Sequence, residues 1–136
     1  MSKKSILFII CLVVTLTVVA IPAMAADDLK VAMILSGPIN DDDFNSVGYN
    51  GLKKACEELG VEYAYIESVP DADAERIIRE YVANGYGLIF AHSFSFGEAA
   101  SKVAADFPEV IFMNAGTPPV ENPNLGTYDN PDYQGA

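Results

Sequence analysis

The chain has 136 residues, of which 19 are acidic and 8 are basic, giving a formal net charge of −11. This length is typical of one domain or of part of a larger protein. The acidic balance excludes nucleic-acid binding, because that function needs clustered Lys and Arg to displace counterions from phosphates. The hydrophobic fraction of 51% is high, but much of it is concentrated in residues 1–25.

Residues 1–25 have the pattern of a Sec signal peptide. Two lysines precede an uncharged apolar run over residues 5–21, and Ala23-Met-Ala25 supplies the small side chains that signal peptidase requires. The run has about the minimum length for crossing a bilayer, so an uncleaved membrane anchor is the alternative. Small residues directly after the run favour cleavage behind Ala25. Residues 26–136 would then form the exported chain, with a net charge of −13 because two lysines and no acidic residue are removed.

The exported part starts with a predicted strand and a predicted helix. Residues 29–35 form a near-continuous apolar run, which is typical of a strand buried on both faces. Apolar residues at helical spacing then predict a helix over residues 44–59. Asp42 or Asp43 is predicted to cap the start of this helix, and Gly60 is predicted to end it.

Cys56 lies on the apolar face of that predicted helix. The other cysteine of the chain, Cys11, belongs to the predicted signal peptide, so the exported chain has no pair that could form an internal disulfide. Unpaired cysteines on apolar faces are commonly buried. Cys56 is therefore predicted to be a buried and unreactive thiol.

The alternation of strand and helix continues along the rest of the chain. The pattern predicts, in order, a strand over 61–66, a helix that opens at 71–73, a strand over 87–91, a helix over 96–107, a strand over 110–113 and a short strand over 125–128. Strands that alternate with helices connect by right-handed crossovers and form a parallel sheet with helices on both faces. The predicted fold class is α/β, with a doubly wound parallel sheet.

Ligands of such sheets bind beside the carboxyl ends of the strands. Three predicted loops lie there, at residues 36–45, 92–96 and 114–117. The chain has no Gly-rich phosphate loop and no nucleophile elbow beside its sole histidine, so nucleotide phosphates and a Ser-His-Asp hydrolase are disfavoured. No cofactor and no metal is expected, because the acidic run over 41–43 lacks the spacing of a calcium loop. An enzyme is the least supported class.

Aromatic and polar side chains in these loops favour a pocket for a small neutral polar molecule. Phe44 and Phe94, together with Phe96, could enclose a flat heterocycle. The alternative is that Phe44 and Phe96 are ordinary core residues of their helices. Asp41 is the acidic residue furthest from the predicted helix start, so it is predicted to face the cleft while its neighbours cap the helix.

Several stretches of the chain resemble the basic membrane protein (Bmp) family. Residues 39–45 (INDDDFN), followed by 48–52 (GYNGL), resemble the first-loop motif of that family, and residues 85–99 resemble its third-strand block. Residues 133–136 (YQGA) resemble the start of a later helix. The resemblance extends over residues 29–136. Proteins of this family are similar to the substrate-binding components of ABC transporters, and many bind purine nucleosides.

The resemblance implies a fold and a function together. The expected fold is an incomplete, Rossmann-like first lobe of a type I periplasmic binding protein. The expected function is the capture of a small neutral polar ligand, with a purine nucleoside favoured, for an ABC permease in the inner membrane. The expected location is therefore the periplasm.

The resemblance also assigns residues to the ligand. Asp41 and Asn45 would hydrogen-bond it, and Phe44 would stack on its base. Asn114 stands where relatives often have Asp, so it would still bond a ribose hydroxyl but without a charge. The full set of implied ligand-binding residues is Asp41, Phe44, Asn45, Ser93, Phe94 and Asn114.

The chain is short for this family. Members have two lobes with the ligand closed between them, whereas these 136 residues correspond to the first part of the first lobe. The chain is therefore expected to be a fragment or a truncated reading frame, and by itself to bind ligand weakly or not at all.

Two other classes of protein are alternatives to the transport component. An exported sensory module of similar fold, signalling to a membrane receptor, is the alternative function. A cytoplasmic receiver domain is rejected, because the third predicted strand ends in Phe90-Ala-His-Ser93 and has no phosphoacceptor Asp there.

Overall fold

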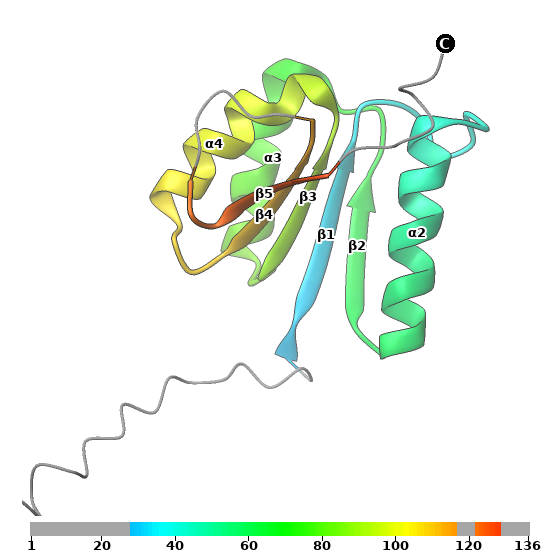
Figure 1. Ribbon diagram of the computed structural model, residues 1–136, viewed down its shortest axis with the longest axis horizontal. Helices are drawn as coiled ribbons and strands as arrows, with labels where there is room; N and C mark the ends of the chain where they lie inside the picture. The colour runs from blue at the N-terminus through cyan, green and yellow to red at the C-terminus, as the bar shows by residue number, and fades with distance from the viewer. Residues whose placement is uncertain (1–27, 117–121, 129–136) are drawn as a thin grey trace, which may run out of the picture.

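The computed structural model describes residues 28–116 and 122–128, so the predicted signal peptide and residues 133–136 lie outside the described part. Five parallel strands form one sheet in the order β2-β1-β3-β4-β5 (Figure 1). The elements in chain order are β1 (Lys30–Leu35), α2 (Phe44–Leu59), β2 (Glu62–Ile66), α3 (Asp71–Ala83), β3 (Leu88–His92), the 3-10 turn η2 (Phe94–Phe96), α4 (Gly97–Asp106), β4 (Ile111–Ala115) and β5 (Leu125–Tyr128).

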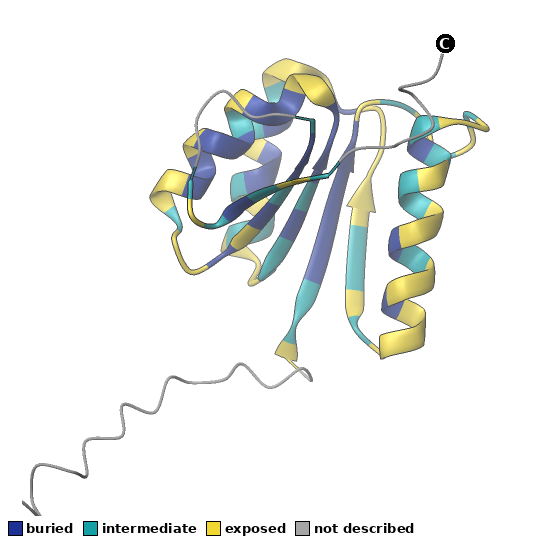
Figure 2. Cartoon of the chain, viewed as in Figure 1, coloured by how far each residue is buried: buried dark blue, intermediate teal, exposed yellow. Residues whose placement is uncertain are grey.

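The predicted α/β class with a parallel sheet is confirmed. β1 pairs in parallel with both β2 and β3, and β4 pairs with β3 and β5. Every residue of β1 after Lys30 is buried, as its continuous apolar sequence predicted (Figure 2). A strand of this kind is apolar on both faces because helices cover both sides of the sheet.

Helices cover the two faces of the sheet unequally. α3 and α4 pack on one face and bury the larger core, whose biggest members include Ile34, Ile78 and Phe112. On the other face α2 packs over β1 and β2, and its Leu52 and Cys56 contribute to a smaller core. The prediction of a buried thiol is confirmed, and burial raises the pKa of Cys56.

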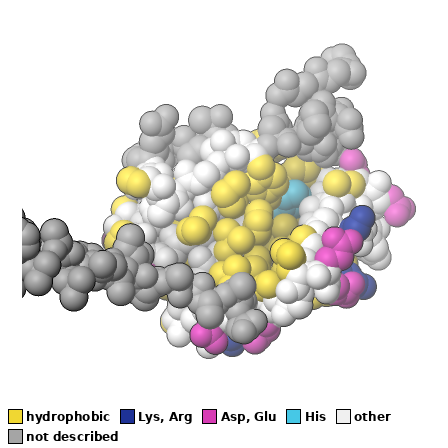
Figure 3. All heavy atoms as spheres, turned by 60° about the horizontal axis from the view of Figure 1, so that its bottom comes forward, with side chains coloured by type: hydrophobic (Ala, Val, Ile, Leu, Met, Phe, Trp, Pro, Cys, Tyr) yellow, Lys and Arg dark blue, Asp and Glu magenta, His cyan; other side chains and the backbone are white. Residues whose placement is uncertain are grey.

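An apolar groove, here called the α2 groove, runs between α2 and the sheet. Its volume is about 360 Å³, and Figure 3 shows a face of the molecule on which apolar side chains gather. One wall comes from α2, and the floor comes from β1, β3 and β5. The lining residues are Leu29, Val31, Met33, Val47, Gly48, Gly51, Leu52, Ala55, Cys56, Leu59, Val61, Leu88, Phe90 and Tyr128.

Two element boundaries differ from the sequence-based expectation in a way that affects the site. β3 extends one residue further than predicted, so His92 belongs to the strand and not to the following loop. The predicted helix over 96–107 is preceded by the separate turn η2, because the Ser93 hydroxyl accepts a hydrogen bond from the Ser95 N–H and starts a 3-10 turn. None of the helices in the described ranges is both long enough and apolar enough to span a membrane.

Candidate ligand-binding site

The candidate site lies at the carboxyl ends of β1, β3 and β4, where the three predicted loops meet one edge of the sheet. The loop after β1 is held to the loop after β2 by three hydrogen bonds. The Ile39 N–H donates to Glu67 Oε2 at 2.7 Å, and the Ser68 N–H donates to the Gly37 carbonyl at 3.2 Å. The third runs from the Val69 N–H to the carbonyl of Leu35 at 2.9 Å. The acidic loop after β1 is therefore held in place by residues of the loop after β2.

Asp41 caps the start of α2. Its Oδ1 accepts hydrogen bonds from the N–H groups of Asp43 and Ser46, and its Oδ2 accepts from the N–H and the side-chain amide of Asn45. The prediction that Asp42 or Asp43 caps this helix was wrong. Asp43 stands at the N-cap position, but its side chain makes no capping bond, because Asp41 reaches over it to the same N–H groups.

The electrostatics of Asp41 follow from these four donors. Partial desolvation raises the pKa of Asp41, but the bonds from Ser46, Asn45 and Asp43 together outweigh it and hold the pKa well below its ordinary value. The carboxylate is therefore ionised and fully engaged in this structure. Its predicted role toward a ligand stays a prediction, and direct contact would require one of the four bonds to be exchanged.

Asn45 is buried and links the cap to the first strand. Its Oδ1 accepts from the Gly37 N–H at 3.1 Å, and its Nδ2 donates to Asp41 Oδ2 at 2.8 Å. These bonds use one of the two N–H groups of the amide. No described residue accepts from the other N–H group.

Phe44 and Phe94 are brought together, as the sequence analysis expected of cleft residues. Their ring centroids are 5.8 Å apart and the ring planes differ by 20°. Phe94 is 61% exposed, whereas Phe96 is fully buried, so the reading of Phe96 as a core residue is confirmed. The Phe94 ring lies directly over Gly116, where a Cβ atom would collide with it.

Ser93 forms hydrogen bonds with its neighbour Ser95 in this structure. It is buried, and its hydroxyl bonds to the hydroxyl of Ser95 at 2.8 Å. The Ser95 hydroxyl in turn donates to Asp71 Oδ1 at 2.6 Å and so joins η2 to the start of α3. A ligand contact from Ser93 stays a prediction.

Asn114 is the most enclosed of the predicted ligand residues. It is 0% exposed, and its Nδ2 donates to the carbonyls of Ala115 and Gly116. Its Oδ1 is buried and finds no hydrogen-bond partner among the residues that the structure describes; an unpaired amide oxygen is costly. The predicted bond from Asn114 to a ribose hydroxyl would need this end of β4 to open.

Three residues at the edge of the site, Gly48, His92 and Tyr128, were not assigned to the ligand site from the sequence. His92 bonds through Nδ1 to the Tyr128 hydroxyl at 2.6 Å and through Nε2 to the Phe44 carbonyl at 2.9 Å. Gly48 lies so close to the His92 ring that a Cβ atom would overlap it. The lone histidine was noticed, but its partners lie 36 and 48 residues away, and local spacing carries no signal of them.

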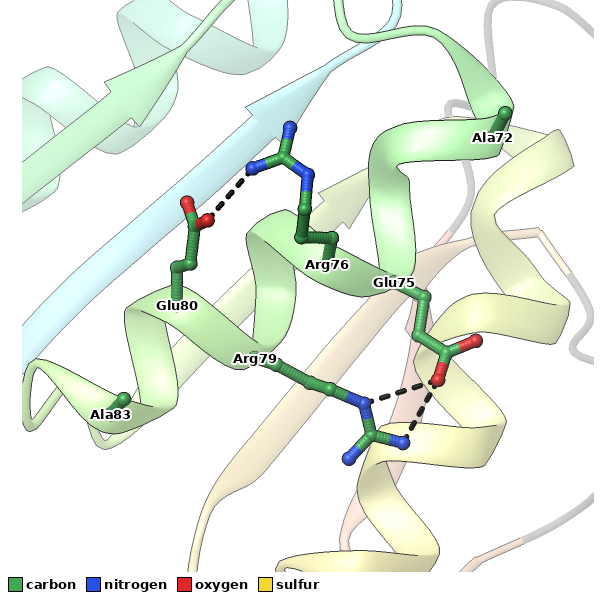
Figure 4. Close-up of a pocket in the computed structure, with 6 residues that line it drawn as sticks. All are labelled: Ala72, Glu75, Arg76, Arg79, Glu80 and Ala83. Carbon is green, nitrogen blue, oxygen red and sulfur yellow. Dashed lines mark hydrogen bonds and ion pairs between the residues drawn. The ribbon is translucent and has the colours of Figure 1, made fainter.

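A second hollow lies on α3, apart from the α2 groove. A hollow of about 520 Å³ on the outward side of α3 is lined by charged residues that pair with one another. Figure 4 shows Arg76 reaching Glu80 and Arg79 reaching Glu75 along the same helix. Arg79 also bonds Asp106 of α4. In these exposed pairs each arginine is matched by a carboxylate, and pairs of this kind contribute little to stability. Within the described ranges, no group of three potential metal ligands is found.

Comparison with known proteins defines the class of the chain. Over 74% of its length it superposes on an ABC transporter solute-binding protein from Conexibacter woesei, with a TM-score of 0.69 and 28% identity, covering 35% of that protein. A solute-binding protein from Aeropyrum pernix matches the same share with a TM-score of 0.67 and 25% identity, covering 28% of its chain. The fold is that of the solute-binding proteins of ABC transporters.

Sequence comparison then gives the family. A profile described as "ABC transporter substrate-binding protein PnrA-like" matches residues 28–132, and the chain belongs to this family, Bmp. It is 36% identical over 116 residues to a purine-binding protein of Brucella abortus, an alignment that covers 83% of this chain and 33% of that protein. The chain spans about a third of the length of these relatives.

Proposed function

We propose that this chain is the ligand-contacting part of a periplasmic substrate-binding component of an ABC importer, and that its ligand is a purine nucleoside. The observation that carries this proposal is the pairing of the Phe44 and Phe94 rings at the carboxyl edge of the sheet, next in sequence to the amide of Asn45, which bonds to Asp41. Two near-parallel aromatic rings select a flat heterocycle, and an amide beside them suits its polar edge or a sugar hydroxyl. The Brucella abortus relative, named as purine-binding, supports the same ligand class.

The spacing of the two rings defines how a base would enter. A base held between two rings needs about 7 Å, which is two successive contacts of about 3.5 Å. The observed separation is 5.8 Å. This distance joins ring centroids and not ring planes, so a base would need the two rings to separate. Phe94 is the exposed partner and is carried by the short turn η2, so it is the ring that we expect to move outward when a base binds.

The proposed partner and location follow from the family. Substrate-binding components deliver their ligand to a permease, and the proposed signal peptide over residues 1–25 would export the chain to the periplasm. A binding role, and not catalysis, accounts for a site built from rings, amides and a capped carboxylate. Cleavage behind Ala25 is tested by N-terminal sequencing of the chain recovered from the periplasm of an expressing cell. A mature start elsewhere, or retention in the membrane, would contradict it.

Ligand choice is tested by nuclear magnetic resonance titration, which detects weak binding by a partial site. Adenosine is expected to shift the ring signals of Phe44 and Phe94, adenine to shift them less, and ribose to leave them unchanged. Phe94→Ala is expected to abolish the response, because it removes the outer ring. Phe107→Leu is the matched control, since Phe107 lies at the far end of α4 and packs against the core.

One outcome of the same titration would overturn the nucleoside proposal. Ribose and adenosine shifting the same polar signals equally, with the two rings unaffected, would replace it with a sugar-binding function. The chain spans about a third of the length of its relatives, so we expect weak affinity, and micromolar binding by isothermal titration would contradict this expectation.

A further inference from the structure

His92 joins three elements of the fold at the edge of the site. It is the last residue of β3 and only 4% exposed. Its Nε2 lies 2.9 Å from the carbonyl oxygen of Phe44 at the start of α2, and its Nδ1 lies 2.6 Å from the hydroxyl of Tyr128 at the end of β5. Because a carbonyl can only accept, Nε2 must carry the hydrogen in the neutral ring. Nδ1 then accepts the hydrogen of the Tyr128 hydroxyl.

The same imidazole also stacks on the Phe44 ring. The His92 and Phe44 centroids are 4.0 Å apart with an angle of 12° between the planes, and Tyr128 is 5.8 Å from His92, also at 12°. One side chain therefore fixes both the backbone carbonyl and the ring of Phe44. Such a double contact restricts the ring far more than either contact alone, because neither the main chain nor the side chain can rotate without breaking one.

We propose that His92 is a positioning residue that holds the Phe44 ring in the orientation required for stacking on a ligand, in the tautomer that the Phe44 carbonyl sets and the Tyr128 hydroxyl complements. This inference rests on the proposed function, in which Phe44 stacks on the base. His92 does not contact the ligand. It prepares the ring in advance, so that little conformational freedom is lost when the base binds.

The groups around His92 are consistent with a neutral ring at neutral pH. Burial lowers the pKa of His92, while the hydrogen bond to Phe44 and the negative charge of Asp41 act in the opposite direction. Asp41 from the loop before α2 and Tyr128 from β5 are the titratable groups that face it among the described residues. A neutral ring has one donor and one acceptor nitrogen, which match the carbonyl and the hydroxyl.

The tautomer gives a test that does not depend on ligand binding. His92 is the only histidine of the chain, so a long-range ¹H–¹⁵N spectrum of the full chain contains one imidazole and needs no assignment. The expected pattern is a protonated Nε2 and an unprotonated Nδ1. In Tyr128→Phe, which keeps the ring and removes the hydroxyl, the Nδ1 signal should shift markedly. A protonated Nδ1 in the unaltered chain would overturn the proposal.

Two variants separate the two contacts of His92. His92→Phe keeps the stacked ring without the hydrogen bonds, and His92→Gln keeps a donor without the ring. Each is expected to weaken adenosine binding about five- to tenfold, the size of one aromatic contact, and to change the ring-current shifts of Phe44. If His92→Phe does not fold, His92→Gln and Tyr128→Phe still decide the question.

The failures of the two proposals are distinguishable. Adenosine that shifts Phe94 in the unaltered chain but binds the His92 variants with unchanged affinity would overturn the positioning role and leave the nucleoside function standing. Adenosine that shifts neither ring in the unaltered chain would overturn both.

Discussion

Gly48 of α2 lies against the imidazole of His92 so closely that no side chain fits between them. The contact joins the helix to the end of β3 and lets the His92 Nε2 reach the carbonyl of Phe44. Gly51, one turn further along the same helix, has nothing within 4 Å of the place where its Cβ would be. Glycine is therefore required at position 48 of this helix, whereas position 51 can accept a side chain.

Alanine at these two positions should therefore change stability in opposite directions. Gly48→Ala should lower the free energy of unfolding by about 1–3 kcal/mol, because a methyl group must displace the His92 ring. Gly51→Ala should raise it by about 1 kcal/mol, the difference in helix propensity. Urea unfolding followed by circular dichroism measures both. Equal changes in the free energy of unfolding of the two variants would show that the close contact does not affect stability.

The acidic loop should make stability dependent on pH through Asp41. Its pKa in the folded chain lies below the ordinary value of 3.8. The stabilisation is therefore complete above that value and is lost as the pH falls through the lower, folded-state pKa. Asp41→Asn should lower the midpoint of urea unfolding at about pH 6 and should flatten its fall toward about pH 3.

Asp42→Asn is the control for that experiment. Asp42 adopts a left-handed backbone conformation with φ of 56°, which Asn also tolerates, and no described hydrogen bond uses its side chain. Its unfolding midpoint should follow that of the unaltered chain. The same loss of acid sensitivity in both variants would mean that the loop charge as a whole, and not the cap, is responsible.

Asn124 closes the end of α4 and should be important for stability. Its Nδ2 lies 2.9–3.0 Å from the carbonyls of Ala104, Phe107 and Val110. Asn124→Ala should cost about 1–3 kcal/mol, since partly buried carbonyls lose their donor. Asn84→Ala, which removes a similar bond to Glu80 at the exposed end of α3, should cost under about 1 kcal/mol because water replaces the donor. Thermal unfolding of the two variants compares them directly.

The α2 groove should promote self-association of the isolated chain. Val47 and Leu59 of its wall are 59% and 76% exposed, and contiguous apolar surface of this kind promotes association. Val47→Lys combined with Leu59→Lys should reduce binding of the dye ANS and self-association in analytical ultracentrifugation. The free energy of unfolding should change by less than about 0.5 kcal/mol per site, as for other surface changes.

The control for the groove is Ile66→Lys, which replaces a partly exposed apolar residue of β2 outside the groove. It should leave dye binding unchanged. A similar decrease in this variant would assign the effect to net charge instead of to the groove.

Much of the fold could be predicted from local sequence. The continuous apolar run of β1 and the alternation of helices and strands gave the parallel sheet, and β5 lies at the residues predicted for it. These features depend on periodicity within a few turns or strand residues. The family motif around residues 39–45 covers the loop in which Asp41 bonds to Asn45 at the start of α2, and the roles that it implies toward a ligand stay predictions.

The site was less predictable, because its geometry depends on contacts between distant segments. Which acid caps α2 is decided by the path of the loop: Asp41 accepts from the Ser46 N–H, and a bond from Ile39 to Glu67 of the loop after β2 fixes the preceding residues. The burial of Asn114 depends on the packing around the end of β4, which its own strand pattern does not reveal. The partnership of His92 with Tyr128 requires β3 and β5 to end at the same edge of the sheet.

The position of β1 has a consequence for the order in which the chain is made. β1 is the first strand to be synthesised, yet it lies inside the sheet, and one of its two neighbours, β3, is complete only at His92. Until that residue has emerged, β1 has an open edge of unpaired N–H and C=O groups on an apolar strand. A nascent chain therefore exposes this edge to other chains over this interval. Fragments that end before His92 should accumulate as aggregates, whereas fragments that end just after it should remain dispersed for longer.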